Sequence, residues 1–146
     1  MDYLGRAIRD QRRAILDQDR AAEAEATFRG SLTLKDEGGG TAVSRGITLD
    51  MLGHAIRDQG RAAEAEATFH RSLVLKEEGG GTAVSRGITL DELGRAIRDQ
   101  GRAAEAEETF RRSLALAEEG GGSADLLDLI RQDLEKAKAP NTQLSN

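Results

Sequence analysis

The chain has 146 residues, of which 38% are hydrophobic and 3% aromatic, and its formal net charge is −5. This balance argues against nucleic-acid binding, which generally requires a basic domain with clustered lysines and arginines. Cysteine is absent, which excludes disulfides and thiolate metal sites and fits a reducing compartment, so we expect a cytoplasmic protein. No apolar run reaches the roughly 20 residues of a membrane helix, and the first residues do not resemble a secretory signal, so we expect no membrane partner.

A period of 41 residues runs through the sequence. Phe28, Phe69 and Phe110 are separated by this distance, and three Gly-Gly-Gly runs follow the same spacing. A fixed period of this size is typical of stacked supersecondary units. We therefore expect one repeat domain over residues 1–139, with repeats at 1–40, 41–81 and 82–122, a capping helix at 123–139, and a polar tail at 140–146.

The first unit departs most from its copies. Residues 4–11 match residues 93–100 letter for letter, but they lie one heptad away from the 41-residue register. We prefer the ungapped register, in which Asp19 takes the place of Gly60 and a turn is expected at Asp19-Arg20, because aspartate tolerates the left-handed conformation. This register puts Gln11-Arg12 where the other units have Leu-Gly, so we expect the first helix to pack less well than its copies.

The second unit shows the expected local structure most clearly. Thr41 is a suitable N-cap for a helix whose apolar residues mostly recur every three or four positions. Gly60 ends this helix and a second helix follows, up to the Gly-Gly-Gly linker that begins at Gly79. Each unit is therefore predicted to be helix, tight turn, helix and glycine linker, which gives seven helices with the cap.

The capping helix begins at Ser123, which stands where the other units have threonine. Leucines and Ile130 form one apolar stripe, and charged residues, among them Asp133, line the other side. One face is thus expected to cover the last repeat while the other faces water. Pro140 is expected to end the helix.

Several spaced positions resemble the tetratricopeptide repeat family. They are Leu-Gly in the first helix, a small residue in the second helix, and an aromatic four residues after it: Leu52, Gly53, Ala65 and Phe69, and again Leu93, Gly94, Ala106 and Phe110. The small residues let the helices approach closely, and the aromatic side chain fills the space between repeats. The closing proline of the family is replaced by Glu77 and Glu118. The 41-residue length resembles the longer variant of kinesin-light-chain-type repeats.

The resemblance implies an all-α, right-handed solenoid of three helix pairs and a cap. In such arrays the first helix of each pair, helix A, lines a concave groove that binds a peptide or a helix. By the resemblance, the groove side chains are Arg6, Arg9, Arg13 and Asp17 in the first unit, Asp50, His54, Arg57 and Asp58 in the second, and Asp91, Arg95, Arg98 and Asp99 in the third.

Two interpretations of the charged residues in this groove remain open. The arginines recur in every unit and could hold the carboxylates of an acidic peptide through forked hydrogen bonds. Alternatively, each arginine pairs with a nearby aspartate, as Arg95 would with Asp91 and Asp99 at helical spacing.

The sequence offers no catalytic constellation. His54 and His70 lie on different helices and are interpreted as surface histidines, and the glycine runs lack the lysine and preceding strand of a phosphate loop. We interpret the Ala-Glu-Ala-Glu runs as solvated charges. We therefore expect no enzyme activity, no metal and no cofactor.

Two functions remain as hypotheses. The first is a scaffold that binds a protein or peptide partner in the groove of the A helices. The alternative is self-assembly into a homo-oligomer, by stacking through an N-terminal unit that no polar capping helix precedes, or by exchange of near-identical units between chains.

Overall fold

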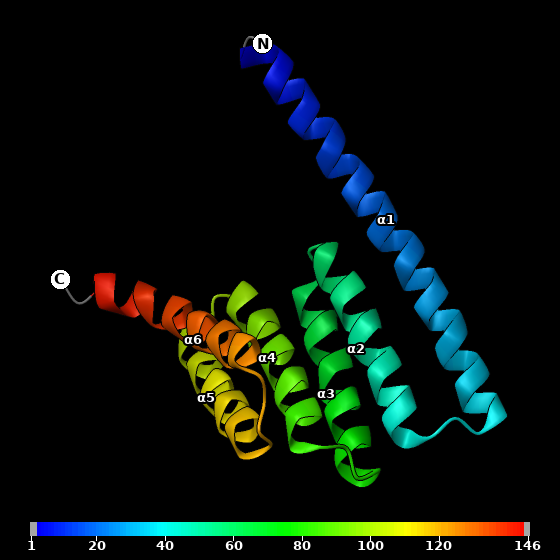
Figure 1. Ribbon diagram of the computed structural model, residues 1–146. Helices are drawn as coiled ribbons and strands as arrows, with labels where there is room; N and C mark the ends of the chain where they lie inside the picture. The colour runs from blue at the N-terminus through cyan, green and yellow to red at the C-terminus, as the bar shows by residue number, and fades with distance from the viewer. Residues whose placement is uncertain (1–2, 145–146) are drawn as a thin grey trace.

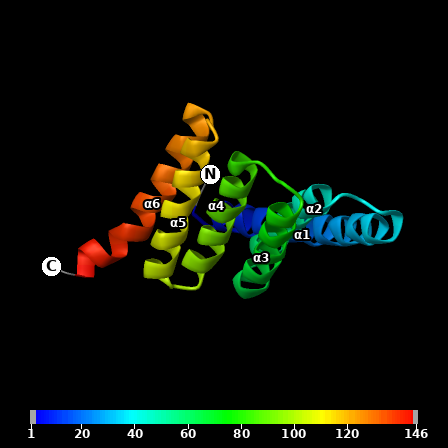
Figure 2. The ribbon, with the colours of Figure 1, turned by 90° about the horizontal axis from the view of Figure 1, so that it is seen from below.

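The computed structural model describes residues 3–144, which form six α-helices. These are α1 (Tyr3–Gly38), α2 (Ala42–Asp58), α3 (Ala62–Glu78), α4 (Ala83–Asp99), α5 (Ala103–Glu119) and α6 (Ala124–Leu144). Each helix packs against its neighbours in the chain, as Figures 1 and 2 show from two sides. α2 also contacts α4, and α4 contacts α6, so these three helices form one layer. The predicted all-α solenoid of stacked helices is confirmed.

The helix starts and turns of the second and third units follow the predicted signals. The hydroxyls of Thr41 and Thr82 each accept a hydrogen bond of 3.0 Å from the backbone N–H three residues later. Ser123 does the same at 3.2 Å for α6. Gly60 and Gly101, in the turns within the two helix pairs, both have φ of +79°. A side chain disfavours this backbone conformation, so glycine is required there.

In each helix pair, a phenylalanine ring of the second helix packs directly against a glycine of the first helix. Phe69 and Phe110 are fully buried. A Cβ atom on Gly53 would lie 2.6 Å from the Phe69 ring, and one on Gly94 would lie 2.6 Å from the Phe110 ring. The Leu-Gly and phenylalanine positions therefore depend on each other, because any larger residue in place of the glycine would displace the ring.

We expect Ala65→Leu to lower the free energy of unfolding by roughly 1–3 kcal/mol. Ala65 is fully buried in the same core cluster as Leu52 and Phe69, where added methylenes strain the neighbouring side chains. Urea unfolding followed by circular dichroism measures the change. The control is Ala67→Leu, at an exposed position of the same helix, which should stay within about 0.5 kcal/mol of the parent. Equal stability of the two variants would show that α3 does not bury Ala65.

The first unit is one continuous helix, so the predicted turn at Asp19-Arg20 is wrong. The array has two helix pairs, a single long α1 and the cap, which makes six helices in the described residues instead of seven. Two residues account for the difference. Asp19 replaces the glycine that makes the turn elsewhere, and Arg12 stands at the position of Gly53, where a hairpin would press its side chain against Phe28.

The first half of α1 extends beyond the rest of the array (Figure 1). Residues 6–20 are all exposed, and the first buried residue of α1 is Ala21. The expectation that this segment packs less well than its copies is therefore confirmed. Several large apolar side chains remain in contact with solvent: Tyr3, Leu4, Ile8, Ile15 and Leu16.

The cap differs from its prediction in two respects. α6 continues past Pro140 to Leu144, so the predicted end of the helix at Pro140 is wrong. The expected polar tail is thus helical over residues 140–144, and residues 145 and 146 lie outside the described residues. Ile130 is buried as expected, but so is Asp133, which was placed on the solvated side.

A lysine from each of the first two units crosses to the next unit. The Lys35 ammonium donates to Thr48 at 2.8 Å, and the Lys76 ammonium donates to Thr89 at the same distance. In the third unit the corresponding positions hold Ala117 and Ile130, two fully buried apolar residues. The contact between units thus changes from polar to apolar where the array meets its cap.

Candidate functional site

An exposed stripe of side chains follows one face of α2. Ile47, Met51, His54 and Asp58 recur at helical spacing, and each is about half exposed. The corresponding positions on α4 lie in the same layer of helices. We call this set the A-helix stripe: Ile47, Met51, His54 and Asp58 of α2, with Ile88, Glu92, Arg95 and Asp99 of α4.

Sequence reasoning found only part of this stripe. It included His54 and Asp58, as well as their counterparts on α4, but it missed the apolar members Ile47 and Met51. Met51, His54 and Asp58 follow Ile47 by four, seven and eleven residues, which places all four on one face of a helix. This spacing was the available signal.

Most of the predicted groove residues of α2 are engaged within the protein. Arg57 Nε donates to Asp99 Oδ2 of α4 at 2.6 Å. Asp50 accepts from the Lys76 ammonium at 2.6 Å and from the Thr89 hydroxyl at 3.0 Å. These pairs join neighbouring helices and fix their relative positions.

A second charged cluster joins α4 to α6. Arg95 Nε lies 2.9 Å from Asp133 Oδ2 and 3.2 Å from Asp91 Oδ2. Arg98 lies 3.5 Å from Asp133, and its guanidinium also stands over the Phe110 ring at 5.5 Å from the centroid. The i, i+4 pair of Arg95 with Asp91 forms as one interpretation anticipated, whereas Asp99 pairs with Arg57 of the neighbouring helix.

The pKa values of the two carboxyl groups of this cluster shift in opposite directions. Burial raises the pKa of Asp91 to about 8, and a hydrogen bond to Asp133 together with the charge of that carboxylate adds to the effect. Burial also opposes ionisation of Asp133, but its hydrogen bond with Asp91 and the nearby guanidinium groups of Arg95 and Arg98 outweigh burial and lower the pKa of Asp133. The same cluster therefore raises the pKa of Asp91 and lowers that of Asp133.

The predicted arginines of the first unit are not brought to the A-helix stripe. Arg6, Arg9 and Arg13 lie on the exposed first half of α1, as does Asp17. The three arginines lie away from α2 and α4 because α1 does not fold back on itself, whereas Asp17 lines a hollow together with Asp58 of α2. The arginines form a basic surface of their own.

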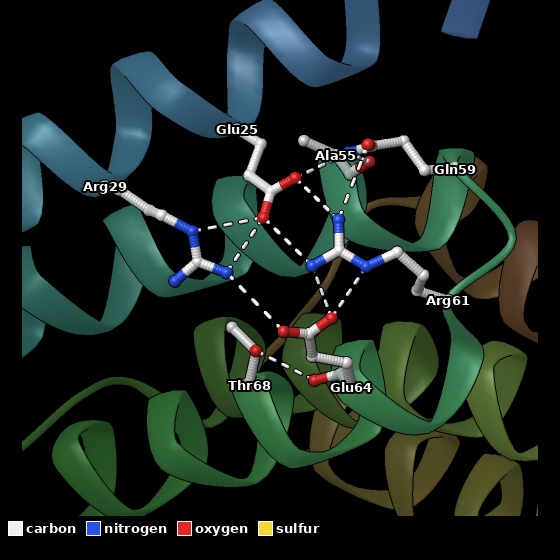
Figure 3. Close-up of polar contacts among 7 residues, drawn as sticks. All are labelled: Glu25, Arg29, Ala55, Gln59, Arg61, Glu64 and Thr68. Atoms are coloured by element: carbon white, nitrogen blue, oxygen red, sulfur yellow. Dashed lines mark hydrogen bonds and ion pairs between the residues drawn. The ribbon is translucent and has the colours of Figure 1, made fainter.

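The glutamates of the Ala-Glu runs are not all solvated, which corrects the expectation for them. Glu25 accepts hydrogen bonds from Arg61 at 2.7 Å, from Gln59 at 2.8 Å and from Arg29 at 2.8 Å (Figure 3). These hydrogen bonds lower the pKa of Glu25 to about 2. Glu66 accepts in the same way from Gln100 and Arg102 of the third unit. The network recurs because the Gln-Gly-Arg turn of each later unit meets the glutamate of the unit before it.

A groove of about 290 Å³ lies between the second half of α1 and α2. We call it the first-unit groove. Apolar side chains of both helices form most of it, and two polar residues of the A-helix stripe lie at its edge. It is lined by Ala21, Ala24, Phe28, Met51, His54, Ala55 and Asp58.

The part of the chain that the structure describes also bears on other classes of site. Within it, no group of three or more histidine, aspartate or glutamate side chains is placed to hold a metal ion. No helix among residues 3–144 combines the length and the apolar character needed to cross a bilayer.

Comparison with known proteins agrees with the geometry of the helix pairs. A family model described as tetratricopeptide repeat matches residues 44–119, which include both glycine–phenylalanine contacts. A search of the curated proteins gave no match. The matched segment is more than half of the chain and runs from α2 to α5. The chain therefore belongs to the tetratricopeptide repeat family.

Proposed function

We propose that this protein is a non-enzymatic scaffold that holds a peptide or a helix of another protein along the A-helix stripe. Tetratricopeptide repeats generally mediate protein–protein interactions and form non-catalytic scaffolds. The observation that carries the proposal is the exposure of Ile47, Met51 and Ile88 on one layer of helices. Apolar side chains in a row on a rigid surface favour the binding of an extended or helical segment.

The ion pairs between helices support this mechanism by preorganising the surface. Arg57 with Asp99 fixes α2 against α4, and Arg95 with Asp133 fixes α4 against α6. A partner then binds without first ordering the helices, which reduces the entropic cost of association. The partner would contact the apolar residues of the stripe, while His54 and Asp58 would provide polar contacts at its edge.

The preference for an acidic partner rests on the first half of α1. Arg57, Arg95 and Arg98 already pair with aspartates, so a ligand would have to displace those carboxylates. Arg6 and Arg9, by contrast, are exposed on a basic segment. We propose that acidic residues of a partner bind there, beyond the stripe.

Selection from a displayed library of random peptides tests the proposal. Enriched peptides would be synthesised, and their affinities measured by calorimetry against the parent and two variants. We expect the double variant Ile47→Asp/Ile88→Asp to weaken binding at least about tenfold, because it places two charges among the apolar contacts.

The matched control for this experiment is Val74→Asp. Val74 lies on α3 and is 49% exposed, comparable to Ile47 at 43%, so the change is equally tolerable to the fold. Peptides should bind this variant as they bind the parent. Selected peptides that bind all three proteins equally would contradict the assignment of the A-helix stripe.

We also propose a second candidate function, self-association through the first unit. The observation that favours it is the row of exposed apolar side chains on the first half of α1, among them Leu4, Ile8 and Ile15. Contiguous apolar surface of this kind commonly marks an interaction site.

A further inference from the structure

α1 begins with a copy of a segment that is buried elsewhere in the same chain. Residues 4–11 and residues 93–100 have the same sequence, Leu-Gly-Arg-Ala-Ile-Arg-Asp-Gln. In α4, Leu93 is 2% and Ile97 4% exposed, because α5 covers them. In α1 the corresponding Leu4 is 66% and Ile8 44% exposed. The first half of α1 is thus a helix A without the second helix of its pair.

The second half of α1, in turn, lacks the helix A that covers its counterparts in the other units. Phe28 corresponds to the fully buried Phe69 and Phe110, but it is only partly buried and lines the first-unit groove. In the other units this ring is covered by the glycine of helix A. Residues 21–38 are therefore a second helix without its helix A.

The two halves of α1 do not meet within one copy. They belong to one continuous helix of 36 residues, which at about 1.5 Å per residue is roughly 54 Å long. A tight hairpin in the repeat register would put Arg12 against Phe28, as the close contact of Gly53 with Phe69 shows. The complementary surfaces are therefore available only to another molecule.

The charges of the two halves indicate which molecule that is. Residues 3–20 contain five arginines and three aspartates, whereas residues 21–38 contain four acidic and two basic side chains. Antiparallel pairing of two α1 helices sets the basic half of each against the acidic half of the other. Parallel pairing would set like charges together, which is unfavourable.

We propose that two copies of this chain exchange the first halves of their α1 helices. Residues 3–18 of one copy pack into the first-unit groove of its partner, and the reverse contact forms by symmetry. The proposal rests on the self-association proposed above and names its geometry. Leu4-Gly5 then meets Phe28 of the other copy as Leu93-Gly94 meets Phe110, and Arg9 takes the position over the ring that Arg98 has in α4.

The displacement of residues 4–11 by one heptad agrees with exchange. In a hairpin with the usual turn, Arg12 would lie opposite the ring of Phe28, and Gly5 would lie seven residues away from that position. Between two copies no turn limits the register, so Gly5 reaches the ring while α1 stays helical.

Single cysteines test the arrangement, because the natural chain has none. In the exchanged dimer the symmetry axis passes near the middle of α1, so two Leu16→Cys side chains lie close to each other. Two Leu4→Cys side chains lie at opposite ends, roughly 35 Å apart along the helices. We expect a short bismaleimide to link Leu16→Cys efficiently and Leu4→Cys at background level. Leu4 and Leu16 are similarly exposed in the isolated chain, at 66% and 55%.

Light scattering coupled to size exclusion supplies the second measurement. We expect the parent chain to have the mass of two copies, and Ile8→Asp to raise the dimer dissociation constant at least about tenfold. Asp128→Ala, at an exposed position of α6 outside the paired segments, should leave it unchanged. The triple variant Gln11→Leu/Arg12→Gly/Asp19→Gly restores the turn and the Leu-Gly pair of the other units, so we expect a monomer with unchanged helicity.

The outcomes separate the two levels of the proposal. A monomeric parent at every concentration up to the solubility limit would overturn both self-association and exchange. A dimer that links equally well through Leu4→Cys, or that is unaffected by Ile8→Asp, would overturn exchange while leaving self-association in place. Peptide binding is tested separately by the variants at Ile47 and Ile88, two residues of the A-helix stripe that do not line the first-unit groove.

Discussion

Replacing Lys76 by methionine should lower the free energy of unfolding by about 3–5 kcal/mol. The Lys76 side chain is only 2% exposed, and its ammonium group lies 2.6 Å from Asp50, itself 12% exposed. Methionine fills the space of the aliphatic stem but leaves the carboxylate of Asp50 without its cation. Removing one member of a buried pair is costly because the remaining charge stays out of water.

Chemical unfolding monitored by circular dichroism measures this effect, and a double-mutant cycle identifies its cause. Asp50→Asn combined with Lys76→Met should recover part of the lost stability, because no unpaired charge remains. Lys136→Ala, at an exposed lysine of α6, should change stability by less than about 0.5 kcal/mol. A Lys76→Met variant as stable as the Lys136→Ala control would show that the buried pair does not hold the units together.

Asp91→Asn should remove a pH dependence of stability that the parent chain shows between about pH 4 and pH 8. The folded state raises the pKa of Asp91 from its ordinary 3.8 to about 8, so the folded protein binds a proton that the unfolded chain has released. Stability is then complete below pH 4 and declines as the pH rises through 8, by up to about 1.4 kcal/mol per pH unit.

Asparagine at position 91 is neutral throughout this range and still donates a hydrogen bond to Asp133. We expect the variant to be similar to the parent at pH 4 and more stable than it by roughly 5 kcal/mol at pH 8, because the parent loses up to about 1.4 kcal/mol per pH unit over this range. Thermal unfolding by calorimetry at a series of pH values gives both profiles. Asp128→Asn, at an exposed position of α6, serves as the control and should keep the parent profile. A variant whose stability declines with the parent slope would rule out Asp91 as the titrating group.

The raised pKa has a cause that can be traced through the repeats. Asp91 corresponds to Asp50, whose lysine partner is Lys76. The third unit has Ala117 in place of that lysine, so Asp91 is buried without an ammonium group, and burial together with the neighbouring Asp133 raises its pKa. One substitution between two near-identical units thus changes the protonation of a residue on a different helix.

The sequence was sufficient for features that depend on local interactions. The N-caps at Thr41 and Thr82, the turn at Gly60 and the pairing of Gly53 with Phe69 all follow from residues a few positions apart or from a repeated spacing. These signals recur in both complete units, so each supports the other.

The sequence was insufficient where a local signal competed with a tertiary one. Asp19 is an acceptable turn residue by itself, but whether the chain turns there also depends on how Arg12 would meet Phe28. The burial of Asp133 depends on the approach of α6 to Arg95 and Arg98, which no spacing within α6 reveals. Only the helical register of the exposed apolar residues could have pointed to Ile47 and Met51.

The lysine contacts between units determine where this array could grow. Suppose that a further 41-residue copy of the second unit were inserted before the third. Its threonine would accept from Lys76 of the preceding unit, and its own lysine would donate to Thr89 of the following unit. The same copy placed after the third unit would bury its threonine hydroxyl against Ala117, with no ammonium group to bind it. Lengthening by duplication is therefore compatible with the interior of the chain and blocked at its capped end, and the two most similar units lie side by side in that interior.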